Sequence, residues 1–403
     1  MRRIVLIAGM GFVAFLSWRF LGAEPRAEVR KLPNPARPGS MAPSLSAGPD
    51  GKVILSWLEP AAAELALKFA EWDGKTWSRP EMVAQRSDFD VYAEAPPSVL
   101  RLAGGTVLAI WGQDIKTGGK WDGSYLFSNV SANGGKHWSP SIRVHSDTSL
   151  SEHSFSSVIG VGPAQALVIW LDARDYDTKD RYRLMSAVVD SKGTVSDEKT
   201  VDSDTCTCCP TALIRAPQGA LAAYRGHNPE DIRDIKVARL ADGNWQQAHT
   251  VHDDLWKINA CPVNGPALAS EGRRLAVLWF TASQDKPEVK IAMSNDLGST
   301  FQAPVTLDSP NGDDRPVGHV ALSLLEDGDA IAVWLHHGAS GTELIGERIS
   351  SAGQHAGRFT IASGAETGFS YPRIQRLGDQ LVISWTGKSN KGVRTATIFT
   401  GTN

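Results

Sequence analysis

The chain has 403 residues and a formal net charge of −3. A charge this close to zero gives no electrostatic footprint for nucleic acid, so we expect no nucleic-acid partner. Length alone allows two or three domains. The 38 glycines and 22 prolines favour a fold of many short strands and turns over one of long helices.

The N-terminus has the composition of a targeting segment. Two arginines precede an apolar stretch, residues 4–18, that is short for a membrane span. We expect residues 1–23 to be a signal peptide, or else an uncleaved membrane anchor within residues 4–22. In either case the protein is exported, to the periplasm or another extracytoplasmic space. Prolines in residues 24–40 predict an extended tether, which leaves residues 41–403 as the folded domain.

A short apolar run that ends in an aromatic residue occurs seven times along the chain. The endings are Trp57, Trp111, Trp170, Tyr224, Trp279, Trp334 and Trp385. Successive endings lie 51 to 59 residues apart. A repeat of this length is typical of a β-propeller, in which one repeat is one four-stranded blade. We therefore expect an all-β propeller of seven four-stranded blades, with a six-bladed ring with irregular ends as the alternative.

The last repeat is incomplete. It ends at a predicted strand over residues 394–399 and has no outer strand of its own. We expect a segment between Glu28 and Pro38 to supply that strand. The two ends of the chain would then close the ring and leave no sheet edge exposed.

Two turn motifs recur at blade spacing. Residues 294–301 read SNDLGSTF and residues 131–138 read SANGGKHW, with eroded copies at residues 72–77 and 242–245. They resemble the Asp-box, Ser-x-Asp-x-Gly-x-Thr-Trp/Phe, in which the Asp or Asn side chain accepts turn amides and glycine takes a positive φ. The chain is thus similar to the sialidase-like (BNR/Asp-box repeat) β-propeller superfamily, and to a cysteine-containing exported subgroup often labelled exo-alpha-sialidase. The resemblance implies that these turns lie on the face away from the site.

The resemblance implies sialidase chemistry, in which three arginines bind the substrate carboxylate and a tyrosine attacks. Two of these groups are missing here. Met41 stands where sialidases keep an arginine, and Phe369 stands at the position of the tyrosine. If the chain is a hydrolase, its catalytic residues would be Arg225, Arg315 and Tyr371. Because a phenyl ring cannot attack, we expect that true sialidase activity has been lost.

The four cysteines fall in two neighbouring repeats. Cys206, Cys208 and Cys209 open the fourth repeat and Cys261 opens the fifth, and Cys206 and Cys261 each lie 18 residues before an aromatic ending. A propeller therefore places them side by side at the rim nearest the axis. Three interpretations stay open: disulfides, the default in an exported protein; a thiolate site for Cu(I) or Zn(II); and a redox-active pair.

Histidines and charged residues lie in loops of the same face. His227 is the histidine that we expect to complete a metal site with the four cysteines. Other loop residues would line a polar-ligand pocket at the mouth of the channel. The expected ligand-binding residues are Asp172, Arg174, Arg225, His227, Asp231, Arg233 and His319.

The sequence therefore favours an exported, sialidase-like propeller that binds a metal, with copper preferred, or a polar ligand at its cysteine-rich axial face. The alternatives are an exo-α-sialidase or related glycoside hydrolase and, third, a protein-interaction scaffold. The expected partners are a small polar ligand, a metal or a glycan, and copper or zinc is the expected cofactor if there is one. We expect a monomer, with membrane anchoring through the N-terminus as an option.

Overall fold

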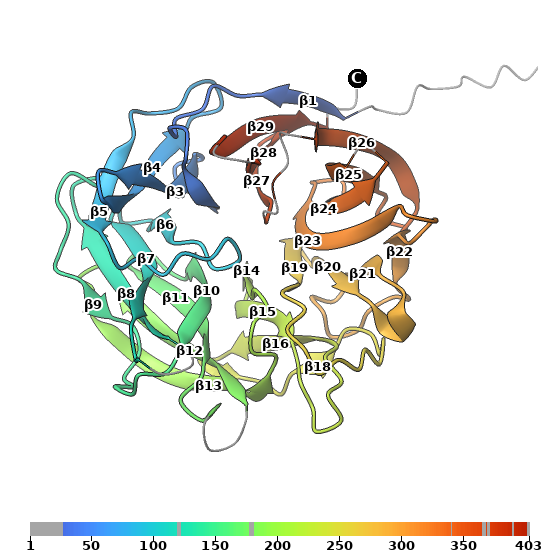
Figure 1. The fold of residues 1–403 in the computed structure, drawn as a ribbon, viewed down its shortest axis with the longest axis horizontal. Helices are drawn as coiled ribbons and strands as arrows, with labels where there is room; N and C mark the ends of the chain where they lie inside the picture. Colours follow the sequence, from blue (N-terminus) through green and yellow to red (C-terminus); the bar gives the residue numbers. More distant parts are fainter. Residues whose placement is uncertain are drawn as a thin grey trace, which may run out of the picture.

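Seven antiparallel sheets stand around one axis in the computed structural model (Figure 1). The structure describes residues 27–118, 122–176, 181–339, 341–364, 368, 371–388 and 391–400. The expected signal peptide or anchor, residues 1–23, lies outside the described residues, and so does Phe369. Within the described part of the chain, no helix is long and apolar enough to cross a membrane.

Six blades each take consecutive strands, written here from the axis outward. Blade I is β2 (Met41–Ala47), β3 (Val53–Ala61), β4 (Glu64–Trp72) and β5 (Glu81–Arg86); blade II is β6 (Ser98–Arg101), β7 (Val107–Ile115), β8 (Gly123–Ser131) and β9 (Ile142–Arg143); blade III is β10 (His153–Gly160), β11 (Gln165–Asp172), β12 (Tyr182–Asp190) and β13 (Val195–Thr205). Blade IV is β14 (Ala212–Ala216), β15 (Gly219–Arg225), β16 (Ile235–Ala241) and β17 (Asn244–Trp245), with β18 (His249–Thr250) also on β16; blade V is β19 (Ala267–Glu271), β20 (Arg274–Thr281), β21 (Glu288–Ser294) and β22 (Val305–Asp308); blade VI is β23 (Arg315–Leu324), β24 (Ala330–Gly338), β25 (Gly341–Ile349) and β26 (His355–Ser363). A 3-10 turn, η1 (Ser283–Asp285), joins β20 to β21.

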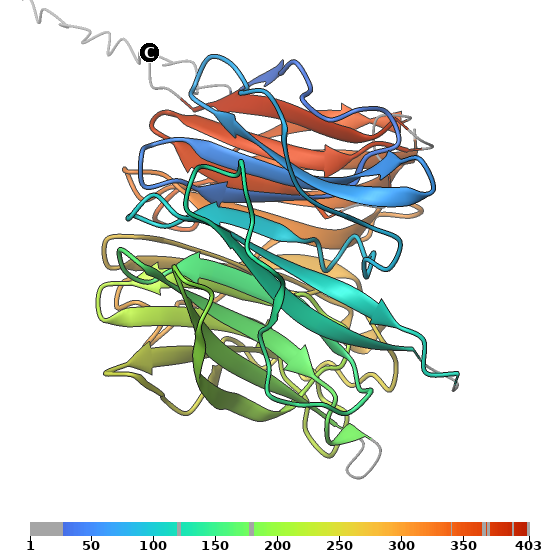
Figure 2. The same ribbon diagram turned by 90° about the vertical axis from the view of Figure 1, so that its left-hand side faces the viewer.

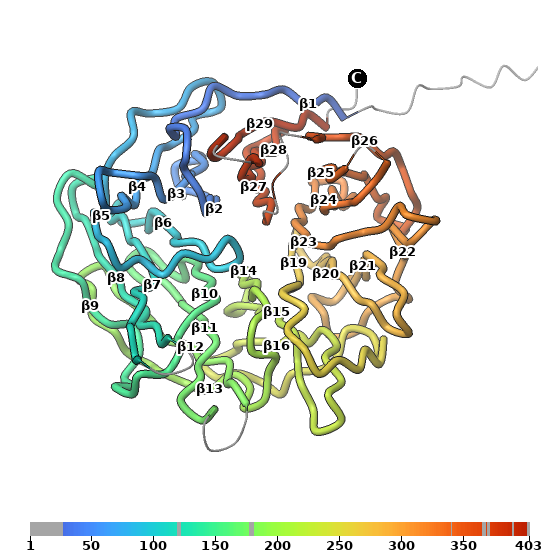
Figure 3. Tube along the Cα trace, viewed as in Figure 1, coloured from blue at the N-terminus to red at the C-terminus, as the bar shows by residue number. Residues whose placement is uncertain are grey.

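Blade VII joins the two ends of the chain. Its strands are β27 (Arg373–Leu377), β28 (Gln380–Thr386), β29 (Val393–Phe399) and, outermost, β1 (Glu28–Lys31). β1 pairs antiparallel with β29 from Glu28 opposite Phe399 to Lys31 opposite Ala396. The first and last strands accordingly lie together in the side view and in the chain trace (Figure 2, Figure 3). This confirms the seven-bladed ring and its predicted closure, and it makes part of the expected tether a strand of the propeller.

The repeated aromatic residues lie on the second strand of every blade and are buried. Six of them donate a side-chain hydrogen bond to a carboxylate or amide oxygen at 2.6 to 2.9 Å. The pairs are Trp57–Glu59, Trp111–Asn129, Trp170–Asp172, Tyr224–Asp202, Trp279–Asp254 and Trp334–Asp308. The repeat thus combines a large apolar ring with a partner for its single polar atom.

The hydrophobic clusters lie between adjacent blades. The cluster between blades V and VI, for example, packs Leu278 and Ile291 against Val320 and Trp334. Because each blade buries its apolar faces against two neighbours, a closed ring covers them all.

The Asp-box segments form the expected turns between third and fourth strands. The Ser294 hydroxyl accepts a hydrogen bond from the Gly298 amide at 2.8 Å, and the Asp296 carboxylate accepts one from the Thr300 amide at 2.9 Å. Residues 131–138 repeat the pattern. In an antiparallel blade these turns lie at the end opposite the loops that lead to the next blade, so they build the ring and leave the other face free for a site.

Candidate functional site

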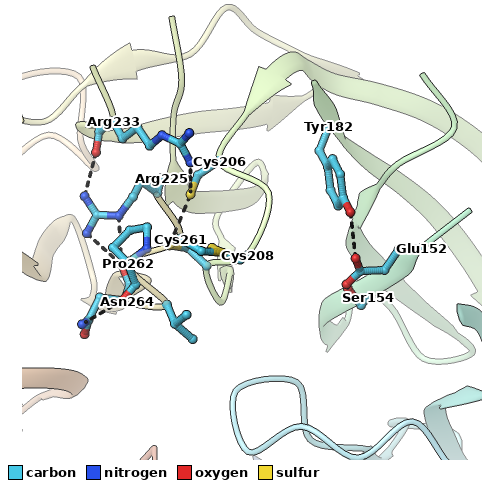
Figure 4. Close-up of a disulfide and its surroundings, with 12 residues drawn as sticks. Glu152, Ser154, Tyr182, Cys206, Cys208, Arg225, Arg233, Cys261, Pro262 and Asn264 are labelled. Carbon is cyan, nitrogen blue, oxygen red and sulfur yellow. Dashed lines mark hydrogen bonds between the residues drawn. A yellow bond between two sulfur atoms is a disulfide. The ribbon is translucent and has the colours of Figure 1, made fainter. Parts of the chain in front are cut away.

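Two crossing loops, which connect one blade to the next, meet at the axial rim of blade IV. Residues 206–211 run from β13 to β14, and residues 251–266 run from β18 to β19. A Cβ atom on Gly265 would lie 1.9 Å from the backbone oxygen of Pro210, so only glycine allows this approach. The approach brings Cys261 to Cys208, and the two form a disulfide with Cα atoms 5.9 Å apart (Figure 4).

Cys206, Cys208 and Cys209 form a buried group, called here the thiol cluster. Their three sulfur atoms lie within 4.8 Å of one another. Cys206 and Cys209 are free, and their sulfur atoms are 3.5 Å apart. The repeat correctly placed Cys206 and Cys261 in adjacent loops, but the disulfide forms from Cys208, which leaves a thiol pair beside it.

Positive charge lies next to this pair. Arg233 Nη1 donates a hydrogen bond to the Cys206 sulfur at 3.4 Å. The hydrogen bond with Cys209 and, more weakly, the Arg225 guanidinium lower the pKa of Cys206 to about 5, against the opposing effect of burial. Burial raises the pKa of Cys209 well above its usual value. The first thiolate of the pair therefore forms at Cys206.

Arg225 is held by the backbone of the protein. Its side chain is buried, and it donates to the carbonyl of Asn264 at 3.0 and 2.7 Å, to that of Arg233 at 2.7 Å and to that of Phe280 at 2.8 Å. The guanidinium also lies 4.7 Å from the ring centre of Trp256. Arg225 was expected to face a substrate. In the structure its hydrogen bonds instead join blade IV to blade V and to the second crossing loop.

An axial cavity of 410 Å³ adjoins the thiol cluster. In it Tyr371 stacks on His319, with ring centroids 3.9 Å apart and planes 13° from parallel, and the Tyr371 hydroxyl donates to the carbonyl of Val263. Burial, followed by the electrostatic effect of Cys209, raises the pKa of Tyr371 above its usual value. Glu94, from the crossing loop between blades I and II, lines the same cavity. The cavity thus holds two expected residues, Tyr371 and His319.

His227 does not join the cysteines. One ring nitrogen lies 2.7 Å from a carboxylate oxygen of Asp204 and the other lies 3.3 Å from one of Asp231. Both nitrogens are therefore engaged with carboxylates, and the expected Cys/His metal site is reduced to its cysteines. The same carboxylate oxygen of Asp231 that contacts His227 lies 3.9 Å from Arg233 Nη2.

The remaining expected residues lie apart from the cavity lining. The buried Asp172 carboxylate accepts two hydrogen bonds of 2.7 Å from Arg174 and one of 2.9 Å from the indole of Trp170, and Arg174 also bonds Glu198. Arg315 is exposed at the start of β23. Asp172 and Arg174 thus form an ion pair in blade III, and Asp172 also belongs to a second group of close ligand atoms with Asp147 and His153, away from the thiol cluster.

The profile of the BNR repeat-like domain matches residues 61–383, which is most of the chain. The chain belongs to the BNR repeat-like family. No curated protein matches it in sequence.

Solved structures similar to this BNR repeat-like propeller include carbohydrate-active enzymes. The polysaccharide lyase Uly1 shares 9% identity at a TM-score of 0.53, over 89% of this chain and 90% of that one. The α-L-arabinanase of Penicillium chrysogenum, complexed with arabinobiose, shares 11% identity at a TM-score of 0.49, over 93% and 98%. The K499G mutant of the NanB sialidase from Streptococcus pneumoniae shares 11% at 0.46, over 92% and 70%. Identities this low show the fold alone.

The sequence analysis did not identify several residues of the candidate site. Glu94 and Asn264 line the cavity, and Asp90 lies in the same loop as Glu94, where burial and the charges of Glu152, Asp114 and Glu94 raise its pKa to about 7. A signal was available, because Glu94 lies 17 residues before Trp111 and so almost at the repeat position of Cys206.

Proposed function

We propose that this propeller binds Cu(I) at its axial face through the thiolates of Cys206 and Cys209. The observation that carries the proposal is a buried pair of free thiols with sulfur atoms 3.5 Å apart. Thiolates are soft ligands and favour Cu(I) over harder cations. The exported location expected from residues 1–23 would make the protein a copper-binding component outside the cytoplasm.

The donor set favours copper over zinc. A structural zinc site has four protein ligands from cysteine, histidine or carboxylate. Within the described residues, the group of close ligand atoms at this site consists of cysteines, and Cys208 is already bonded to Cys261. Two free thiols are too few for such a zinc site.

The surrounding charge suits a bis-thiolate complex. Two thiolates and one Cu(I) ion carry a net charge of −1, which would be costly to bury alone. The guanidinium of Arg233 touches the Cys206 sulfur, and that of Arg225 favours its thiolate. These two cations offset the charge of the complex.

The axial cavity offers a place where a small copper-carrying ligand would dock. Asn264 lines it, and the backbone amide of Asn264 also bonds Cys209. A polar ligand in the cavity would therefore be separated from Cys209 by Asn264 alone. The expected metal site and the expected polar-ligand pocket would then be parts of one site.

The test is an anaerobic Cu(I) titration against a chromophoric Cu(I) chelator. We expect one ion per chain in the wild type and a loss of affinity of about 100-fold or more in the double variant Cys206→Ser/Cys209→Ser. Thr207→Ala, in the same loop, is the matched control and should bind as the wild type does. Melting curves show that each variant is folded. Equal binding by the double variant, or none by a wild type with two titratable thiols, would contradict the proposal.

A second candidate is hydrolysis of a glycoside, as in the sialidase that shares the fold. One observation favours it: Tyr371 lies in a cavity with Glu94, a tyrosine beside a carboxylate. Against it, the Tyr371 pKa is raised and Arg225 is bound to backbone. Release of the fluorophore from a fluorogenic sialoside, abolished by Tyr371→Phe and retained in Cys206→Ser/Cys209→Ser, would establish this activity in place of copper binding.

A further inference from the structure

The disulfide between Cys208 and Cys261 joins a buried residue to an exposed one. Cys208 is 9% exposed and belongs to the thiol cluster, whereas Cys261 is exposed and follows two other exposed residues, Asn259 and Ala260. In thiol–disulfide exchange the attacking thiolate bonds the sulfur that it can reach, and the other sulfur leaves. Attack from solvent is therefore directed to Cys261 and releases Cys208 into the cluster.

We infer that an external dithiol opens this disulfide at Cys261 and thereby adds Cys208 as a third thiolate of the copper site. The inference rests on the proposed copper binding by Cys206 and Cys209. It adds the regulation of that site and the chemical class of the partner that performs it, a protein or small molecule with two neighbouring thiols.

The dithiol alone supplies the two electrons and two protons that the reduction of the disulfide requires. One donor thiolate attacks the Cys261 sulfur, a mixed disulfide forms, and Cys208 leaves as a thiolate. The second donor thiol then attacks the donor sulfur of the mixed disulfide and releases Cys261. The donor is oxidised to its own disulfide, and the two electrons and two protons it gives up appear as the thiols of Cys208 and Cys261.

The cluster keeps its shape when the disulfide opens, because other contacts hold the first crossing loop. The backbone amide of Cys206 donates to the carbonyl of Arg225 at 3.1 Å, and the Thr211 hydroxyl donates to the carbonyl of Phe155 at 2.9 Å. Both ends of the loop are thus fixed without Cys261. Cys208 then stays within 4.8 Å of the other two sulfurs, at a distance from which all three reach one ion.

The second crossing loop is also held independently of the disulfide. The carbonyl of Asn264 accepts two hydrogen bonds from Arg225, and its side-chain oxygen accepts one from the His319 amide at 2.8 Å. Only the exposed part of this loop, which carries Cys261, is left to contact a partner. The donor therefore meets a short exposed segment and does not need to enter the cavity.

Two single variants separate ligand supply from loss of the disulfide. Cys261→Ser and Cys208→Ser both remove the disulfide, but only Cys261→Ser leaves three thiols in the cluster. We expect Cys261→Ser to bind Cu(I) tightly with or without prior treatment by dithiothreitol, and Cys208→Ser to bind weakly under both conditions. The Cu(I) affinity of the wild type should rise by about tenfold or more when dithiothreitol has reduced the disulfide and has then been removed. Melting curves again show that the variants are folded.

The point of entry is tested by trapping. A thioredoxin-fold protein with a single remaining attacking cysteine should form a mixed disulfide with Cys261 of the wild type, located by peptide mass mapping. A mixed disulfide at Cys208 would overturn the inference. The wild-type comparison with and without reduction keeps the question decidable if a variant fails to fold.

The outcomes distinguish the two proposals. If no form of the protein binds Cu(I), the proposed function fails. If the wild type binds through Cys206 and Cys209 but reduction leaves its affinity unchanged and Cys261→Ser equals Cys208→Ser, copper binding stands and the inference of a third, redox-controlled ligand fails.

Discussion

Arg225 carries a positive charge into the interior of the ring and bonds backbone carbonyls there. Its four hydrogen bonds satisfy three carbonyl groups from a β-strand, a crossing loop and the segment before β16. Hydrogen bonds of charged donors are stronger than neutral ones, which offsets the cost of burying the guanidinium. The same charge lowers the pKa of Cys206. Structure and thiol chemistry therefore depend on one side chain.

Arg225→Met should destabilise the fold by about 3 kcal/mol or more, because three buried carbonyl groups lose their donor. Urea denaturation measures the change. Arg315→Met is the control, since the exposed Arg315 should change stability by less than about 0.5 kcal/mol. An Arg225 variant with unchanged stability and lost ligand binding would instead support a substrate-binding role.

Asp90 gives a pH-dependent prediction. Its folded pKa is about 7, above the usual 3.8, so the folded state favours the protonated acid and loses stability as the pH rises through that range. Asp90→Asn removes this cost and should stabilise the protein by on the order of 2 kcal/mol at pH 8, with little effect at pH 4. Urea denaturation at the two pH values tests it. The exposed Asp50→Asn serves as the control, and an equal effect of Asp90→Asn at both pH values would contradict the assignment.

The crossing loops are the elements that build the site. Their approach at Gly265 and Pro210 depends on a missing side chain, and the disulfide depends on that approach. Adjacent blades alone do not fix which cysteines meet. The close contact of Gly265 with Pro210 brings together the two loops that carry Cys208 and Cys261.

Gly265→Ala should force the two loops apart and destabilise the protein by roughly 1 to 3 kcal/mol, because the clashing atoms are backbone. It should also raise the number of thiols that react under non-reducing conditions. Thiol titration and thermal melting measure both effects. Gly162→Ala is the matched control, since a Cβ there has no neighbour within 4 Å. A variant with wild-type thiol content would show that the loops tolerate the added methyl group.

The sequence predicted the elements better than the contacts between them. The aromatic endings are periodic because every blade needs a buried ring at the same place, so Trp57 and its equivalents predicted the blades and their number. The spacing of Cys206 and Cys261 from these aromatic residues also placed the two cysteines in neighbouring loops. The repeat did not indicate where the His227 ring lies, because its contacts with Asp204 and Asp231 depend on side chains that a repeat pattern does not encode.

Closure of the ring belongs to the whole molecule. β1 has only four residues, yet it covers the edge of β29 and removes the exposed edge of the ring. A chain that begins at Pro33 should melt several degrees lower and aggregate more readily.

A peptide of residues 24–38 should bind this shortened chain and restore part of the lost melting temperature, as a strand added to an open edge. The same peptide with Arg30→Pro should bind poorly, since proline disrupts strand pairing. Fluorescence anisotropy of labelled peptide measures the difference. Equal binding of the two peptides, or a shortened chain as stable as the full one, would show that β1 is dispensable.

The pairing of Glu28 with Phe399 also sets the order of events when the protein is made. The two residues are 371 positions apart, so at about 5 to 20 residues per second the first strand waits roughly 20 to 75 seconds for its partner to be synthesised. A chain that stops early never provides that partner. Its first strand stays unpaired, and the ring stays open at its seam.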